Sequence, residues 1–179
     1  ILQTPGPQTE EDGLELSFAT PSGKIEFYSK QLEEAGFDPM PEYTPQEEPA
    51  PGMYRLLFGR APVHSFGRTV NNRLLCEAFP ENVLWVSDKV CEELGFTDGD
   101  RVMVFNQDEV SSGPIAIRRT RRIRNDCVYM VHGWGRKLPA LECANGKGAS
   151  DSDLVTRYKT DPIMGGTGMN VNFVRMERA

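Results

Sequence analysis

The stretch "HSFGRTVNN", residues 64–72, concentrates hydrogen-bonding side chains on one loop. Two further segments are also dense in glycine, asparagine, serine and charge: "HGWGRK" (132–137) and the long segment 145–172. Glycine lets a backbone approach a ligand closely, and asparagine offers both a donor and an acceptor to a heteroaromatic edge. Ordinary turn chemistry accounts for each loop alone. Three such loops on one scaffold indicate a site for a large polar ligand such as a nucleotide.

The residues that could catalyse a reaction or bind a metal lack the spacing of the familiar motifs. Neither His64 nor His132 lies in a G-x-S-x-G or H-E-x-x-H sequence, so no catalytic triad or zinc protease site is predicted. For His64 we expect a hydrogen-bonding or structural imidazole rather than a general base. The sequence therefore predicts no catalytic residue and no metal ligand. The four cysteines form no CxxC pair and are expected to be unpaired and partly buried: Cys76, Cys91, Cys127 and Cys143.

The net charge of −6 is unevenly distributed along the chain. Residues 1–50 carry 11 of the 26 acidic and 2 of the 20 basic side chains, which leaves the rest of the chain at +3. The basic run "RRTRRIR" (118–124) lacks the interleaved aromatic residues of a nucleic-acid-binding surface, so we expect no nucleic-acid partner. We expect its arginines to pair with the acidic N-terminal segment or a neighbouring subunit, and some of them to help bind phosphate.

Strands must position these loops, because apolar and alternating runs dominate the chain from residue 53. One helix is predicted over 87–95, with Ser87 as its N-cap and Gly95 as the residue that ends it. Many strands and few helices indicate a mainly β protein built on a small barrel. A doubly wound sheet is not expected, since the crossover helices are missing. The predicted strands are 53–59, 82–87, 101–106, 113–120, 127–133 and 172–176.

The first third of the chain differs from the rest in composition and in its predicted elements. Residues 1–17 are predicted to be a linker from a preceding domain. Residues 18–52 are predicted to form a short strand at 24–28, a short helix at 30–36 and a proline-rich connector, and residues 53–179 the barrel. No signal peptide or membrane-spanning run is apparent, and the chain begins with Ile1, so we expect it to be part of a longer protein.

Five segments resemble a known family in their order and spacing. They are "TPSGKIEFYS", "GRAPVHSFGRTVNN", "LWVSDKVCEELGFTDGDRVMV", "GASDSDL" and "DPIMGGTGMNVNFVRM". Together they are similar to the C-terminal part of molybdopterin oxidoreductases of the dimethyl-sulfoxide-reductase family, from about Phe18 to the C-terminus. "HSFGRTVNN" and "GGTGMNVNFV" look closest to the thiosulfate, polysulfide and tetrathionate reductases.

The resemblance implies a double-psi β-barrel that binds bis(molybdopterin guanine dinucleotide). In this family the loop after the first barrel strand contacts the pterin and phosphate parts of the cofactor. A family asparagine falls near Ser152, which leaves Asp151 or Asp153 as alternative guanine partners, and a family lysine aligns with Asn170. The cofactor contacts implied for this chain are Arg60, His64, Ser65, Thr69, Asn71, Asn72, His132, Gly133, Asp151, Ser152, Asn170 and Asn172.

The resemblance also implies what other parts of the enzyme supply. Other domains of the full-length subunit would hold the molybdenum or tungsten and a 4Fe–4S cluster, so this fragment alone would have no turnover. Its partners would be the remaining domains, an iron–sulfur electron-transfer subunit and a membrane-anchor subunit, in a periplasmic or membrane-associated enzyme of anaerobic respiration. The alternative is a free-standing double-psi barrel that acts as an interaction or small-ligand-binding domain, because one fold can serve unrelated functions.

Overall fold

The computed structural model describes residues 18–40 and 42–179, and the chain divides into two compact units, Ile1–Gln46 and Glu47–Ala179. In the first unit, helix α1 (Lys30–Glu34) begins after Ser29, whose hydroxyl accepts a hydrogen bond from the Leu32 amide. The strand expected over 24–28 is wrong: these residues form bends beside a turn. Side-chain hydrogen bonds such as that from the Ser22 amide to Glu26 satisfy the turn locally. The predicted linker, 1–17, lies outside the described residues.

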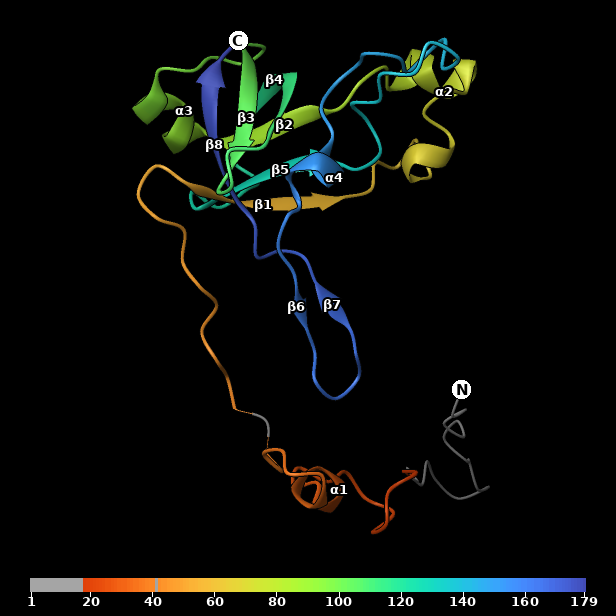
Figure 1. The fold of residues 1–179 in the computed structure, drawn as a ribbon, viewed down its shortest axis with the longest axis vertical. Helices are drawn as coiled ribbons and strands as arrows, with labels where there is room; N and C mark the ends of the chain where they lie inside the picture. Colours follow the sequence, from red (N-terminus) through yellow and green to blue (C-terminus); the bar gives the residue numbers. More distant parts are fainter. Residues whose placement is uncertain (1–17, 41) are drawn as a thin grey trace, which may run out of the picture. The chain divides into compact units, whose positions relative to one another are not determined.

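Six strands of the second unit close into a barrel (Figure 1), and each coincides with a predicted strand. The pairs β1–β5 and β2–β4 are parallel, and the other four neighbouring pairs are antiparallel. The expected fold class, mainly β with few short helices and a double-psi β-barrel, is confirmed. In order around the barrel the strands are β1 (Tyr54–Gly59), β5 (Cys127–Val131), β2 (Val83–Ser87), β4 (Ser111–Thr120), β3 (Arg101–Asn106) and β8 (Phe173–Arg178).

The barrel interior explains the alternating sequence of its strands. On β2, Leu84 and Val86 are fully buried, whereas Trp85 between them faces outward and is half-buried. Each large apolar side chain removed from water contributes about 1.5–3 kcal/mol to folding, so this interior is the main source of stability. A second, smaller apolar cluster surrounds Trp134 and lies under the loops that leave β1 and β5.

Of the helices in the barrel unit, only α3 (Asp88–Leu94) was predicted. Ser87 caps it by accepting from the Val90 amide, and Gly95 ends it with φ of +69°. The short elements η1 (Phe66–Arg68), α2 (Arg73–Ala78) and α4 (Asp151–Leu154) were not predicted, because they are too short to carry a helical apolar pattern.

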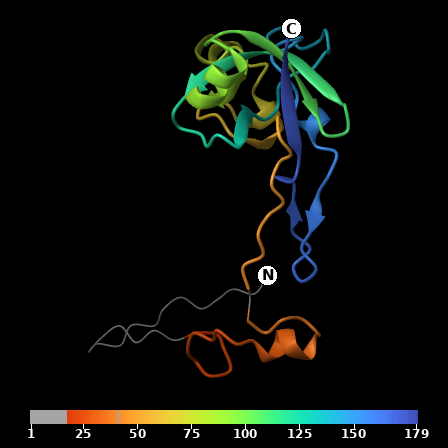
Figure 2. The same ribbon diagram turned by 90° about the vertical axis from the view of Figure 1, so that its left-hand side faces the viewer.

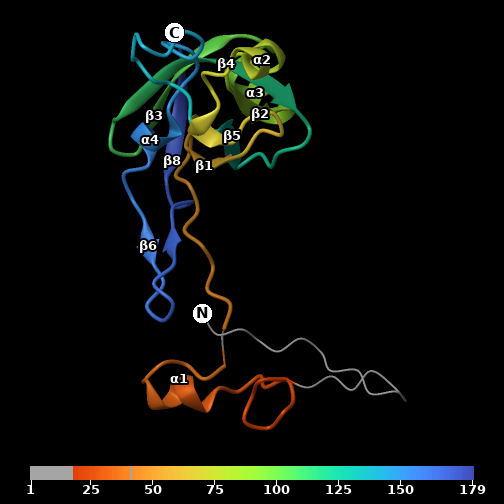
Figure 3. The same ribbon diagram turned by 90° about the vertical axis from the view of Figure 1, so that its right-hand side faces the viewer.

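Strands β6 (Lys159–Thr160) and β7 (Thr167–Gly168) form a hairpin that extends away from the barrel. Figure 2 and Figure 3 show this hairpin from two further directions. Every residue from 156 to 170 is exposed, so the hairpin adds nothing to the barrel core. No helix among residues 18–40 and 42–179 is long and apolar enough to cross a membrane.

Candidate functional site

Glycines at close approaches bring the three polar loops together. Gly133 has φ of +102°, and a Cβ atom built on it would lie 2.4 Å from the backbone nitrogen of Gly67. Gly135 has φ of +79°, and its Cβ would lie 2.3 Å from the backbone nitrogen of Ser150. Contacts this short leave no room for any side chain. The loop after β5 therefore touches both the loop after β1 and the segment that leads into α4.

These loops enclose a groove of about 660 Å³. Part of its lining is apolar and could pack against a flat ring, and part is cationic and could bind an anion. The guanidinium groups of Arg68 and Arg136 have no ion-pair partner in the described part of the chain. Gly67 leaves room for Arg136, since a Cβ at residue 67 would lie 2.8 Å from its terminal nitrogen. The lining residues are Phe58, Phe66, Gly67, Arg68, His132, Arg136 and Met169.

The imidazole of His132 is held in the groove by a buried carboxylate. Its Nδ1 lies 2.7 Å from Oδ2 of Asp151, whose side chain is 2% exposed while that of His132 is 34% exposed. A carboxylate oxygen accepts, so Nδ1 carries the hydrogen and Nε2 is left for another partner. The edge contact between Phe66 and His132, with ring centroids 5.4 Å apart, further fixes the ring. Oδ1 of Asp151 is buried without a hydrogen-bond partner among the described residues.

The side chain of His64, a predicted cofactor contact, makes its hydrogen bonds within the protein. The side chain is buried, Nε2 lies 2.9 Å from the carbonyl oxygen of Phe79, and Nδ1 lies 3.3 Å from the hydroxyl of Thr69. The Thr69 hydroxyl also accepts from the amide of Ser65. Both ring nitrogens are therefore occupied within the loop, and the expectation of a hydrogen-bonding, structural imidazole describes His64 better.

Three predicted asparagine contacts are also hydrogen-bonded within the protein. Asn72 caps α2 by accepting from the Leu75 amide, and Asn71 accepts from the Cys143 amide across to the neighbouring loop. Asn172 is fully buried; its amide group donates to two backbone carbonyls and its oxygen accepts from two backbone amides and from Gln107. All polar atoms of the Asn172 side chain therefore have partners within the protein, and its predicted contact with the cofactor stays a prediction.

The remaining predicted residues lie at the surface. Arg60 stacks on Phe66, with its guanidinium carbon 4.6 Å from the ring centroid, and so adjoins the groove. Ser65, Ser152 and Asn170 are exposed. Arg68 and Arg136 were not among the predicted cofactor contacts, although each lies in one of the polar loops described from the sequence. The apolar lining by Phe58, Phe66 and Met169 was missed as well, since nothing in a single sequence tells an apolar residue that lines a groove from one that fills a core.

The cysteines behave as expected from their spacing. All four are free; Cys76, Cys91 and Cys127 are buried and Cys143 is half-buried. Burial is the largest cause that raises the pKa of the Cys76, Cys91 and Cys127 thiols, so these groups remain protonated at neutral pH. Among the described residues no three histidine, cysteine or acidic side chains gather into a metal site.

Comparison with known proteins shows what the chain is similar to. Residues 54–173 match the family model described as Molydopterin dinucleotide binding domain. The chain is 30% identical over 171 residues to the thiosulfate reductase molybdopterin-containing subunit PhsA of Salmonella typhimurium, and 27% identical over 192 residues to the dimethyl sulfoxide reductase DmsA of Escherichia coli. These matches cover 93% and 94% of this chain but only 22% of each relative.

A solved structure supports the fold. The acetylene hydratase from Pelobacter acetylenicus superimposes with a TM-score of 0.68 at 19% identity, over 92% of this chain and 24% of that one. At this identity the likeness concerns the fold alone.

Proposed function

The chain belongs to the molybdopterin dinucleotide-binding domain family, and from that premise we propose that its groove holds part of bis(molybdopterin guanine dinucleotide). Domains of this family are found in the catalytic subunits of molybdopterin oxidoreductases. Because the chain spans about a fifth of its relatives, other domains of the subunit would hold the rest of the cofactor with its molybdenum or tungsten. Family membership supports this proposal over the alternative of a free-standing interaction barrel.

The groove itself is the observation that carries this proposal. Arg68 and Arg136 supply two unpaired guanidinium groups for the phosphates, since guanidinium matches phosphate oxygens well. The aromatic ring of Phe66 and the thioether of Met169 offer apolar surface to the pterin. Nε2 of His132, held by Asp151, adds one oriented polar contact. These donors and apolar surfaces fit a ligand that is both anionic and heteroaromatic.

The guanine end has a candidate partner in Asp153. Of the two alternatives, Asp151 is buried and binds His132, whereas Asp153 is exposed and lines a small cleft with Ser112 and Lys137. A free carboxylate can accept two hydrogen bonds from the N–H edge of guanine. We therefore assign the guanine contact to Asp153 rather than to Asp151.

When bound, the cofactor supplies the metal chemistry of electron and atom transfer to the substrate. The residues of this chain contribute binding and orientation. The arginines would bind the phosphates, and the loop shaped by His64 would hold its backbone against the pterin. No residue of this chain is proposed to touch the substrate.

Two relatives suggest a reductase of sulfur compounds. The names of both describe reduction at sulfur, of thiosulfate or of dimethyl sulfoxide. We propose thiosulfate, polysulfide or tetrathionate as the substrate, in anaerobic respiration. The proposed enzyme also includes a 4Fe–4S cluster in the same subunit, an iron–sulfur electron-transfer subunit and a membrane anchor, and it is periplasmic or membrane-associated.

Cofactor content of the full-length subunit tests the binding part of this proposal. The variant Arg68→Ala with Arg136→Ala should lose tenfold or more of its molybdenum and pterin occupancy, as each charge-assisted hydrogen bond is worth about 1.5–3 kcal/mol. Arg73→Ala with Arg124→Ala is the matched control, because both arginines are exposed and pair with acids away from the groove. Full occupancy in the first variant would contradict the proposal. Assays of the loaded enzyme with thiosulfate, polysulfide, tetrathionate and dimethyl sulfoxide test the substrate.

A further inference from the structure

A row of outward-facing side chains crosses four neighbouring strands of the barrel. Leu57 on β1 is in register with Tyr129 on β5, and Trp85 on β2 is in register with both Tyr129 and Arg118 on β4. Register partners share one face of a sheet. Because Val86 on β2 and Ile117 on β4, each adjacent to a residue of this row, are buried in the core, this face is the outside of the barrel. The rings of Trp85 and Tyr129 meet edge to face, with centroids 5.4 Å apart.

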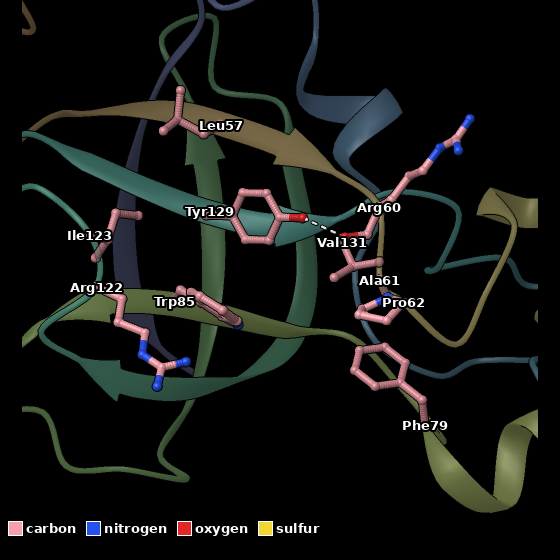
Figure 4. A pocket seen from close by; sticks show the side chains of 10 residues that line it. All are labelled: Leu57, Arg60, Ala61, Pro62, Phe79, Trp85, Arg122, Ile123, Tyr129 and Val131. Carbon is pink, nitrogen blue, oxygen red and sulfur yellow. Dashed lines mark hydrogen bonds between the residues drawn. The ribbon is translucent and has the colours of Figure 1, made fainter.

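This row forms the floor of an apolar pocket of about 400 Å³ on the outer wall (Figure 4). Leu57, Trp85 and Tyr129 lie across it, with Ile123 at one end and Phe79 at the other. The Tyr129 hydroxyl is already used, since it donates to the carbonyl oxygen of Arg60. A hollow of this size and character accepts one or two large apolar side chains, and exposed apolar concavities mark interaction sites.

Arginines that have no ion-pair partner among residues 18–40 and 42–179 border the pocket. Of the five arginines in the run 118–124, three pair with acids of the barrel itself: Arg119, Arg121 and Arg124. The other two, Arg118 and Arg122, have no ion-pair partner among the residues that the structure describes. Arg122 lines the pocket, and Arg118 stands beside Trp85 in the outward row. The wall therefore presents an apolar hollow with two positive charges at its edge that no described side chain neutralises.

We propose that this wall is a docking surface for a segment of the same catalytic subunit that lies outside this chain. That segment inserts an aromatic or aliphatic side chain into the pocket and places carboxylates against Arg118 and Arg122. The proposal rests on the proposed function. Domains of the subunit that close over the groove also meet the loop after β1, which borders the pocket. Arg60 and Pro62 of that loop line the pocket, and Arg60 stacks on Phe66 of the groove, so the groove and the pocket border the same loop.

Length and charge favour this occupant over a second copy of the chain. The relatives are more than four times as long as the part that this chain matches, so most of such a subunit lies outside it. A symmetric pairing of two copies through this wall would bring the free arginines of both copies together. Like charges placed opposite one another disfavour an interface.

Photo-cross-linking in the full-length subunit tests the proposal. With p-benzoylphenylalanine in place of Ile123, irradiation should give an adduct with a peptide of the same subunit outside residues 1–179, and that peptide should contain Asp or Glu. The control position is Lys89 on α3, whose side chain is 66% exposed and lies outside the pocket; it should give no such adduct. Adding Arg122→Glu to the Ile123 variant should lower the adduct yield about tenfold by placing like charges together. Adding Lys89→Glu instead should leave the yield unchanged.

Each outcome of this experiment decides the matter. No adduct at position 123, an adduct with a second copy, or an adduct with another subunit would overturn the proposal. Molybdenum and pterin are measured in the same preparations. Absent cofactor with an intact intramolecular adduct would refute the proposed function and leave the docking surface standing.

Discussion

At the scale of single residues, the imidazole of His64 joins three parts of its loop. The Phe79 carbonyl can only accept, so Nε2 of His64 carries the hydrogen. The Thr69 hydroxyl can then donate to Nδ1 while it accepts from the Ser65 amide. Edge contacts with Phe79 and Trp134, at centroid distances of 5.7 and 5.4 Å, fill the space on both sides of the ring. Every polar atom of the ring is satisfied, so His64 shapes the backbone that faces the ligand.

We therefore expect His64→Ala to destabilise the chain. Loss of a buried, doubly hydrogen-bonded side chain should cost about 2–4 kcal/mol in the free energy of unfolding, because it leaves a cavity and an unpaired carbonyl. Asn72→Ala removes only a helix cap and should cost about 1 kcal/mol. Urea unfolding measures both, with the exposed Ser65→Ala as the control. A loss of unfolding free energy of no more than about 0.5 kcal/mol for His64→Ala would show that the side chain does not hold the loop, and would favour direct contact with the cofactor.

At the scale of elements, the loops depend on backbone contact between glycines. Gly133→Ala places a methyl group 2.4 Å from the backbone nitrogen of Gly67, so one of the two loops must move. Gly165→Ala is the matched control, since Gly165 also has positive φ, at +70°, but nothing lies within 4 Å of its Cβ position. The control should lose only the left-handed backbone cost, about 1–2 kcal/mol, and Gly133→Ala should lose clearly more. Equal losses in urea unfolding would mean that the loops tolerate separation.

A pH dependence follows from the contact of α3 with β4. Hydrogen bonds from Arg121 and Arg119 hold the pKa of the Asp88 carboxyl below its ordinary value of 3.8. A carboxyl with a lowered folded pKa stabilises the fold fully above the ordinary value, and this contribution is lost as the pH falls through the folded value. Unfolding free energies measured from pH 6 to 2 should therefore fall less steeply below pH 4 in Asp88→Asn than in the wild type. Parallel curves would show that these ion pairs contribute nothing, as many exposed pairs do not.

At the scale of the whole molecule, the sequence predicts the scaffold better than the contacts. All six barrel strands follow from period-two or apolar runs, and the polar loops that form the groove were found from their composition. The partners of His64 and Asn172 could not be found in this way. His64 bonds to Phe79 and Asn172 to Arg157, each 15 positions away, a separation at which no local sequence pattern reveals the contact. Residue type indicates what a side chain can bind, and tertiary structure decides whether a ligand or the protein binds it.

The hairpin β6–β7 is expected to be independent of barrel stability. Its residues are exposed, and Asn172 fastens its base through donation to the carbonyls of Arg157 and Met169, each at 2.8 Å. Replacing residues 161–166 with Asn-Gly keeps the paired strands and closes them with a two-residue turn. The thermal midpoint should then change by no more than about 2 °C, as for surface changes. Asn172→Ala removes a fully buried side chain together with its hydrogen bonds to the backbone of Thr156, Arg157 and Met169. It should cost about 3 kcal/mol or more, which lowers the midpoint by roughly 6 °C or more. If shortening the hairpin cost as much as Asn172→Ala, the hairpin would have to belong to the folding core.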